Sequence, residues 1–177
     1  MIYLITGGSG SGKSDYAEQL ILSVSSGEKP IYYVATMIPS EGETEEKIIR
    51  HQRRRSGKGF VTLECYRDLK GLTVPDNDGI LLECVTNLAA NELFREDGMV
   101  AEEEEAASKI FAGIDHLAEQ THRLFLVTGE VGGDDRGYSK ETNMYRALLG
   151  RINCTLAARA DKVTEVVCGI PRILRKK

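Results

Sequence analysis

The segment GGSGSGKS, Gly7 to Ser14, places four glycines, three serines and one lysine in eight residues directly after a short apolar run. It has the spacing G-x-x-x-x-G-K-[ST], with Lys13 and Ser14 at the last two positions. Glycines let backbone N–H groups turn inward and approach phosphate oxygens that side chains would keep away. The pattern indicates a nucleoside triphosphate site in which Lys13 reaches the β- and γ-phosphates and the Ser14 hydroxyl binds Mg²⁺. The predicted phosphate-binding residues are Gly7, Gly8, Ser9, Gly10, Ser11, Gly12, Lys13 and Ser14, with Lys13 also predicted to be catalytic.

A carboxylate that organises Mg²⁺ should lie at the end of a neighbouring apolar strand. The segment GILLECVTNL offers Glu83 at such a place. Because an unpaired carboxylate buried at the end of an apolar strand is costly, this position favours a role in binding metal or nucleotide. The alternative is a structural carboxylate that caps a helix starting near Val85. Ser14 and Glu83 are the predicted metal ligands.

The segment EEKIIRHQRRRSGKGF places one histidine among several cations in a chain of net charge −4. On a helix, Lys47, His51 and Arg55 are spaced by four residues and share a face. Crowded cations favour binding of an anion such as phosphate, and they keep the His51 imidazole neutral and therefore nucleophilic or basic. The alternative is a solvated basic face with a bystander histidine.

The elements that must position these residues follow from the apolar pattern. Predicted strands are Ile2–Thr6, Ile31–Ala35, Phe60–Glu64, Ile80–Cys84, Leu124–Thr128 and Val163–Cys168. Predicted helices are Ser14–Val24, Thr44–Arg55, Leu88–Arg95, Val100–Gln120 and Lys140–Ala160. This alternation predicts an α/β fold with a mainly parallel central sheet and helices on both faces. We find no repeat or linker, and expect residues 1–177 to form one domain.

Composition narrows the class of protein. The chain has 177 residues, of which 41% are hydrophobic and 28% charged, as in an ordinary globular domain. The net charge of −4 argues against a general nucleic-acid binder. No apolar run is long enough to span a bilayer and none resembles a signal peptide, so we expect no membrane span and a cytoplasmic location. The four cysteines lack C-x-x-C spacing and indicate reduced, mostly buried thiols: Cys65, Cys84, Cys154 and Cys168.

Further segments support a family resemblance. They are YVAT at Tyr33–Thr36, KIIRHQRRR, TLE at Thr62–Glu64, LLECVTNL, VTGEVG at Val127–Gly132, LGRIN…LAARAD at Leu149–Asp161, and the closing VVCGIPRIL. With the TGG…SGKS loop, their order and spacing resemble the adenosylcobinamide kinase / adenosylcobinamide-phosphate guanylyltransferase family of cobalamin assembly. The resemblance covers nearly the whole chain.

The resemblance implies a three-layer, RecA-like P-loop NTPase fold, a homotrimer and two activities at one shared site. ATP or GTP phosphorylates adenosylcobinamide, and GTP then donates GMP to adenosylcobinamide phosphate through a guanylylated histidine, releasing pyrophosphate. His51 matches the nucleophile, and such covalent catalysis divides a difficult exchange into two displacements. By the same matching, the guanine nucleotide would be lined by Ala35, Thr36, Met37, Gln52, Arg53, Arg54, Arg55, Glu64 and Glu83. Glu64 would accept hydrogen bonds from guanine or ribose; its alternative is a surface carboxylate at a strand edge.

The chain also departs from the family pattern. It has Gly10 where arginine is usual, Gly129 where asparagine is usual and Phe60 where tryptophan is typical, and GDDRGYSKET over 133–142 replaces a more apolar segment. The nucleotide half of the resemblance is thus intact, whereas the corrinoid-facing half differs. Altered substrate preference, or retention of one of the two activities, would follow.

Three other functions remain open from the sequence. A single-activity kinase would use the same loop, with His51 only binding phosphate. A catalytically idle nucleotide-binding regulator would not need a nucleophile. A nucleic-acid motor is disfavoured by the acidic balance and by the lack of interleaved aromatic and basic residues.

Overall fold

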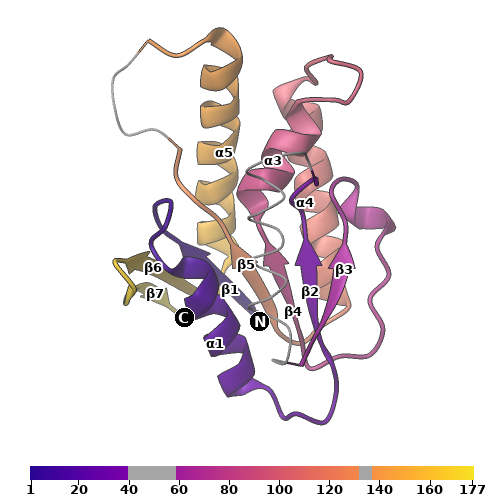
Figure 1. Cartoon of the computed structure of the whole chain (residues 1–177), viewed down its shortest axis with the longest axis vertical. Helices are drawn as coiled ribbons and strands as arrows, with labels where there is room; N and C mark the ends of the chain where they lie inside the picture. The colour runs from indigo at the N-terminus through magenta and orange to yellow at the C-terminus, as the bar shows by residue number, and fades with distance from the viewer. Residues whose placement is uncertain (40–58, 132–136) are drawn as a thin grey trace.

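A seven-stranded sheet forms the centre of the molecule, with the strand order β3-β2-β4-β5-β1-β6-β7 (Figure 1). The structure is a computed structural model and describes residues 1–39, 59–131 and 137–177. The strands are β1 (Ile2–Thr6), β2 (Ile31–Ala35), β3 (Phe60–Glu64), β4 (Gly79–Glu83), β5 (Leu124–Val127), β6 (Lys162–Val167) and β7 (Ile170–Lys176). Neighbouring strands from β3 to β6 are parallel, and β7 runs antiparallel to β6.

Helices cover both faces of this sheet (Figure 1). They are α1 (Lys13–Val24), α3 (Val85–Leu93), α4 (Glu103–Glu119) and α5 (Lys140–Arg159), with the short 3₁₀ helix η1 (Leu69–Gly71) between β3 and β4. Apolar side chains of α1 pack against one face, and those of α3, α4 and α5 contribute to the cluster on the other. These three layers confirm the predicted fold class.

The central strands are almost wholly apolar because both of their faces are covered. In β4, Leu81 joins the cluster under α1, whereas Leu82 joins the cluster under α3, α4 and α5. The same alternation divides Phe125 from Leu126 in β5. The sheet core therefore fixes the register that brings the strand ends to one edge.

Most predicted elements are confirmed, with corrections at their ends. Helix α3 begins at Val85 and ends at Leu93, so the predicted range Leu88–Arg95 is wrong at both ends. The predicted strand end at Cys84 is also wrong, because the Cys84 thiol accepts a hydrogen bond from the Asn87 backbone N–H at 3.4 Å and caps α3. Helix α4 begins at Glu103, three residues after the predicted start. The predicted helix Thr44–Arg55 lies outside the described residues.

The sequence did not predict β7. All seven of its residues are exposed and it mixes a proline with charged and apolar side chains, so no period of two marks it. A tight turn at Cys168 and Gly169, with φ values of 50° and 78°, joins it to β6. Positive φ at both central residues suits a two-residue antiparallel hairpin. In the described ranges, no helix is long and apolar enough to cross a membrane.

Candidate nucleotide site

The glycine-rich loop joins the end of β1 to the start of α1, at the carboxyl edge of the parallel strands. At Gly7 the backbone passes so close to β6 that a Cβ atom would lie 2.5 Å from the Val166 carbonyl oxygen. Gly12 is the N-cap residue of α1 and has no side chain with which to cap the helix. The N–H groups of the first helical turn are thus open to an anion, whose charge the helix dipole favours.

Internal hydrogen bonds hold the loop in a defined shape. The Ser11 backbone N–H donates to the Gly8 carbonyl at 3.2 Å, and the Lys13 ammonium donates to the same oxygen at 3.0 Å. From the β6–β7 hairpin, the Gly169 N–H donates to the Ser11 carbonyl at 2.8 Å. The chain's last hairpin therefore supports its first loop.

Glu83, at the end of β4, lies beside this loop. The Ser14 hydroxyl donates to Glu83 Oε1, and the Tyr33 hydroxyl donates to Glu83 Oε2. Glu83 is half-buried and both of its carboxylate oxygens have donors, so the expectation of a buried, unpaired carboxylate is wrong. The alternative of a helix-capping carboxylate is also wrong, since Cys84 caps α3.

The oxygens of Ser14 and Glu83 are of the kind that Mg²⁺ prefers, and they lie in direct contact. Mg²⁺ is usually held by one or two carboxylates together with substrate phosphates and water. The described residues hold no cluster of three or more His, Cys, Asp or Glu side chains suited to a metal. The donor set fits a cation shared with a bound phosphate.

Sequence analysis did not identify a hydrogen-bonded group near Lys13, which consists of Thr86, Gly129 and Asn153. The Gly129 N–H donates to Thr86 Oγ1 at 2.8 Å, and the Asn153 side-chain amide donates to the Gly129 carbonyl at 3.0 Å. A Cβ atom at Gly129 would lie 3.3 Å from Thr86 Oγ1 and 3.8 Å from Lys13 Cε. The family segments LLECVTNL, VTGEVG and LGRIN contain Thr86, Gly129 and Asn153. They are far apart in the chain, so no local spacing indicated that these residues meet.

The ends of β2 and β3 form the other side of the site. Ala35 is in register with both Glu64 and Glu83. Thr36 is fully buried, and its hydroxyl donates to the Cys84 carbonyl at 2.9 Å while accepting from the Cys84 N–H at 2.7 Å. The Thr36 side chain thus joins β2 to β4. Glu64 is exposed and accepts a hydrogen bond from the Tyr66 hydroxyl at 2.6 Å.

The Tyr66 hydroxyl is an unusually weak acid. Burial and the hydrogen bond to the neighbouring Glu64 carboxylate raise the pKa of Tyr66 to about 12. The phenol therefore stays protonated at neutral pH and keeps donating to Glu64. One Glu64 oxygen is occupied in this way before any ligand binds.

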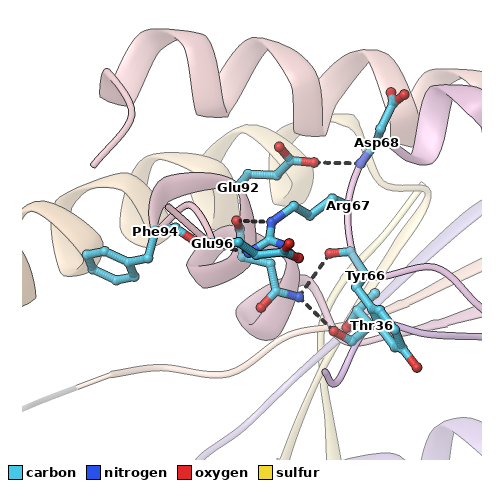
Figure 2. A network of polar contacts seen from close by, with 8 residues as sticks. Thr36, Tyr66, Arg67, Asp68, Glu92, Phe94 and Glu96 are labelled. Atoms are coloured by element: carbon cyan, nitrogen blue, oxygen red, sulfur yellow. Dashed lines mark hydrogen bonds and ion pairs between the residues drawn. The ribbon is translucent and has the colours of Figure 1, made fainter. Parts of the chain in front are cut away.

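Figure 2 shows a polar network that joins the loop after β3 to helix α3. The Asn91 side-chain amide donates to the carbonyls of Thr36 and Tyr66, at 2.8 and 2.9 Å. Arg67 donates to the Asn91 carbonyl at 2.7 Å and forms an ion pair with Glu96. Asn91 therefore connects the segments that follow β2 and β3.

A polar cavity of about 420 Å³ opens beside this network. Its lining residues are Arg67, Asn91, Glu92, Arg95, Glu96, Asp97 and Lys109. Each lining cation is paired, Arg67 with Glu96 and both Arg95 and Lys109 with Glu105. The lining contains no residue of the glycine-rich loop, so the cavity is separate from the phosphate site.

The structure thus brings together the loop residues 7–14, Glu83 and the ends of β2 and β3. The remaining predicted site residues lie outside the described ranges: His51, Gln52, Arg53, Arg54 and Arg55.

Known structures share the fold. The flagellar accessory protein FlaH of Methanocaldococcus jannaschii superposes with a TM-score of 0.54 and 12% identity, covering 99% of this chain and 78% of that one. A KaiC-like protein of Pyrococcus horikoshii gives a TM-score of 0.50 and 15% identity, covering 93% and 69%. At such low identity these likenesses show only the fold, which is that of RecA-like P-loop NTPases, as predicted.

Sequence comparison identifies the family as well as the fold. Residues 3–174 match the model of the cobinamide kinase / cobinamide phosphate guanyltransferase family. The chain belongs to this family. The bifunctional adenosylcobalamin biosynthesis protein CobU of Salmonella typhimurium is 35% identical over 182 residues, covering 96% of this chain and 97% of the relative. CobU of Escherichia coli is 34% identical over 181 residues, and CobP of Pseudomonas aeruginosa 29% over 175 residues.

Membership of the family confirms the predicted class of enzyme, a transferase of cobalamin biosynthesis with kinase and guanylyltransferase activities. It also confirms the predicted resemblance over nearly the whole chain.

Proposed function

We propose that this protein phosphorylates adenosylcobinamide with ATP or GTP and then transfers GMP from GTP to adenosylcobinamide phosphate, giving adenosylcobinamide-GDP and pyrophosphate. The observation that carries the proposal is the contact between Ser14 and Glu83 beside the glycine-rich loop, in a chain that matches the family over residues 3–174. Both reactions need a site that holds a triphosphate and its cation.

In the kinase step, the loop N–H groups and Lys13 hold the transferred phosphoryl group and its leaving diphosphate. Lys13 donates to the Gly8 carbonyl in the free protein and exchanges this partner for phosphate oxygens. Ser14 and Glu83 would hold Mg²⁺, which neutralises the charge on the β- and γ-oxygens when it is bound. The substrate hydroxyl oxygen forms its bond to the γ-phosphorus and gives up its proton to water, while the bond between the γ-phosphorus and the β-phosphate oxygen breaks.

In the second step, the His51 imidazole attacks the α-phosphorus of GTP and the bond to the β-phosphate oxygen breaks, releasing pyrophosphate. A phosphate oxygen of adenosylcobinamide phosphate then attacks the same phosphorus and releases the histidine. Its place in the KIIRHQRRR segment supports His51 as this nucleophile. Gln52, Arg53, Arg54 and Arg55 are proposed to bind nucleotide phosphates beside it.

The guanine and ribose are proposed to lie against the ends of β2 and β3, lined by Ala35, Met37 and Glu64. Thr36, proposed from the sequence for the same lining, is fully buried and would hold the end of β2 in place. The exposed Glu64 carboxylate has a second oxygen with which to accept from guanine N–H groups or ribose hydroxyls. Such hydrogen bonds would favour GTP over ATP. A site whose polar groups pair with one ligand binds another ligand less well if those polar groups are left without a partner.

The wider features of the protein are inferred from its family and sequence. We infer one catalytic domain over residues 1–177, a homotrimer, a cytoplasmic location, and a corrinoid as acceptor. We expect no nucleic-acid partner, given the net charge of −4. We infer that the change over 133–142 bears on the choice of corrinoid, whereas Gly10 removes a cation near the nucleotide phosphates.

Intact-mass measurement after incubation with GTP and Mg²⁺ tests the proposal. We expect a GMP adduct on the wild type and on a His122→Ala control, whose histidine is exposed, and no adduct on His51→Ala. An adduct that survives in His51→Ala would contradict the assigned nucleophile. GTP binding without any adduct on the wild type would instead indicate a single-activity kinase.

A further inference from the structure

Tyr33 is a buried tyrosine of β2 for which neither sequence nor family comparison gave a role. Only 2% of it is exposed, and its ring lies edge-on to Phe60 with centroids 6.0 Å apart. It belongs to the cluster under α1, the helix that carries Ser14 in its first turn. Its hydroxyl donates to Glu83 Oε2.

The Glu83 carboxylate is consequently held from two elements at once. Ser14 donates to Oε1 from α1, and Tyr33 donates to Oε2 from β2. With a separate donor on each oxygen, rotation of the carboxylate plane is restricted. The backbone of Glu83 is fixed as well, because its carbonyl accepts from the Thr36 N–H at 2.9 Å.

We propose that Tyr33 is a positioning residue that orients Glu83 toward a divalent cation at the nucleotide phosphates. The inference rests on the proposed function, in which Ser14 and Glu83 hold that cation. A cation held by Ser14 and Glu83 would compete with the hydrogen bond between them for the same Glu83 oxygen. The Tyr33 hydrogen bond is compatible with the bound cation and remains to set the direction of the carboxylate.

A residue that hydrogen-bonds a metal ligand without touching the metal affects the affinity for that metal. Its loss usually weakens metal binding 10–100-fold. Tyr33→Phe removes the hydroxyl and keeps the ring that packs on Phe60. Tyr32→Phe provides a matched control. Tyr32 is the preceding residue of the same strand, 8% exposed, and its ring joins the cluster on the opposite face of the sheet.

The experiment measures Mn²⁺ binding in the presence of GDP by electron paramagnetic resonance, with Mn²⁺ as the probe for the cation site. We expect Tyr33→Phe to weaken Mn²⁺ binding by about tenfold or more. We expect the Mn²⁺ affinity of Tyr32→Phe to stay within about twofold of the wild-type value, because Tyr32 does not contact the metal ligand. Metal-free GDP affinity should be unchanged in both variants.

A double-mutant cycle with Glu83→Gln separates positioning from a general loss of packing. In the Glu83→Gln background, Tyr33→Phe should have no further effect on Mn²⁺ affinity. Wild-type Mn²⁺ affinity in Tyr33→Phe, or an equal fall in metal-free GDP affinity, would overturn the role of Tyr33 alone. Failure of the wild type to bind Mn²⁺ with GDP would contradict the proposed metal ligands and overturn this inference with them.

Discussion

Single positions of the glycine-rich loop are fixed by contacts with a distant strand. A methyl group on Gly7 would lie 2.5 Å from the Val166 carbonyl oxygen, whereas one on Gly8 would meet no atom within 4 Å. Sequence spacing marks both glycines as part of one motif. Only the packing of the loop on β6 distinguishes the glycine that is sterically required from the one that is not.

Gly7→Ala should therefore lower the free energy of unfolding by about 2 kcal/mol, as overpacking does. Urea denaturation of the nucleotide-free protein measures this change. Gly8→Ala is the control and should stay within about 0.5 kcal/mol of the wild type. Equal effects of the two substitutions on the free energy of unfolding would show that the close approach of Gly7 to β6 does not cause the destabilisation.

Between elements, side chains of α3 determine how the ends of β2 and β3 are held together. The Asn91 amide donates to one backbone carbonyl after each of these strands (Figure 2). Arg67 in turn donates to the carbonyls of Asn91 and Phe94 near the end of α3, where a cation is favourable. The proposed base-binding edge of the site therefore depends on the position of this helix.

Asn91→Leu should destabilise the protein by about 2 kcal/mol, because two carbonyls lose their donor within a partly buried contact. Chemical denaturation provides the measurement. The control is Asn143→Leu, since Asn143 is exposed and donates to one carbonyl, that of Tyr138, at 3.2 Å. A similar loss of stability in both variants would mean that the leucine on the helix surface causes the destabilisation, and not the lost hydrogen bonds.

For the molecule as a whole, burial divides the cysteines into two classes. Cys154 and Cys168 are exposed and Cys65 and Cys84 are half-buried, which corrects the expectation of mostly buried thiols. Burial raises the pKa of Cys65, and it raises the pKa of Cys84 to about 11. A higher pKa leaves less of the reactive thiolate at pH 8.

A disulfide reagent that releases a chromophore should accordingly modify two thiols of the native protein quickly at pH 8, and all four after unfolding in urea. Replacing both exposed cysteines by serine should remove the fast phase. A fast phase that survives this replacement would contradict the expected low reactivity of the half-buried Cys65 and Cys84.

The local pattern of the chain determined much of this protein. The spacing of Gly7, Gly12, Lys13 and Ser14 predicted the phosphate loop, and short apolar runs bounded by turn residues or charges predicted six of the strands. These features depend on neighbouring residues, because periodicity and turn chemistry act over a few positions. The same pattern placed Glu83 at the end of a strand, close to the loop.

The tertiary structure alone decided which partners surround these residues. The hydrogen bonds of Tyr33 to Glu83, of Gly169 to Ser11 and of Gly129 to Thr86 each join positions 43 or more residues apart. The exposed β7 strand carries no apolar period, and its antiparallel pairing with β6 was seen only in the structure. Such contacts depend on how the sheet is ordered and how helices pack on it, which no local pattern encodes.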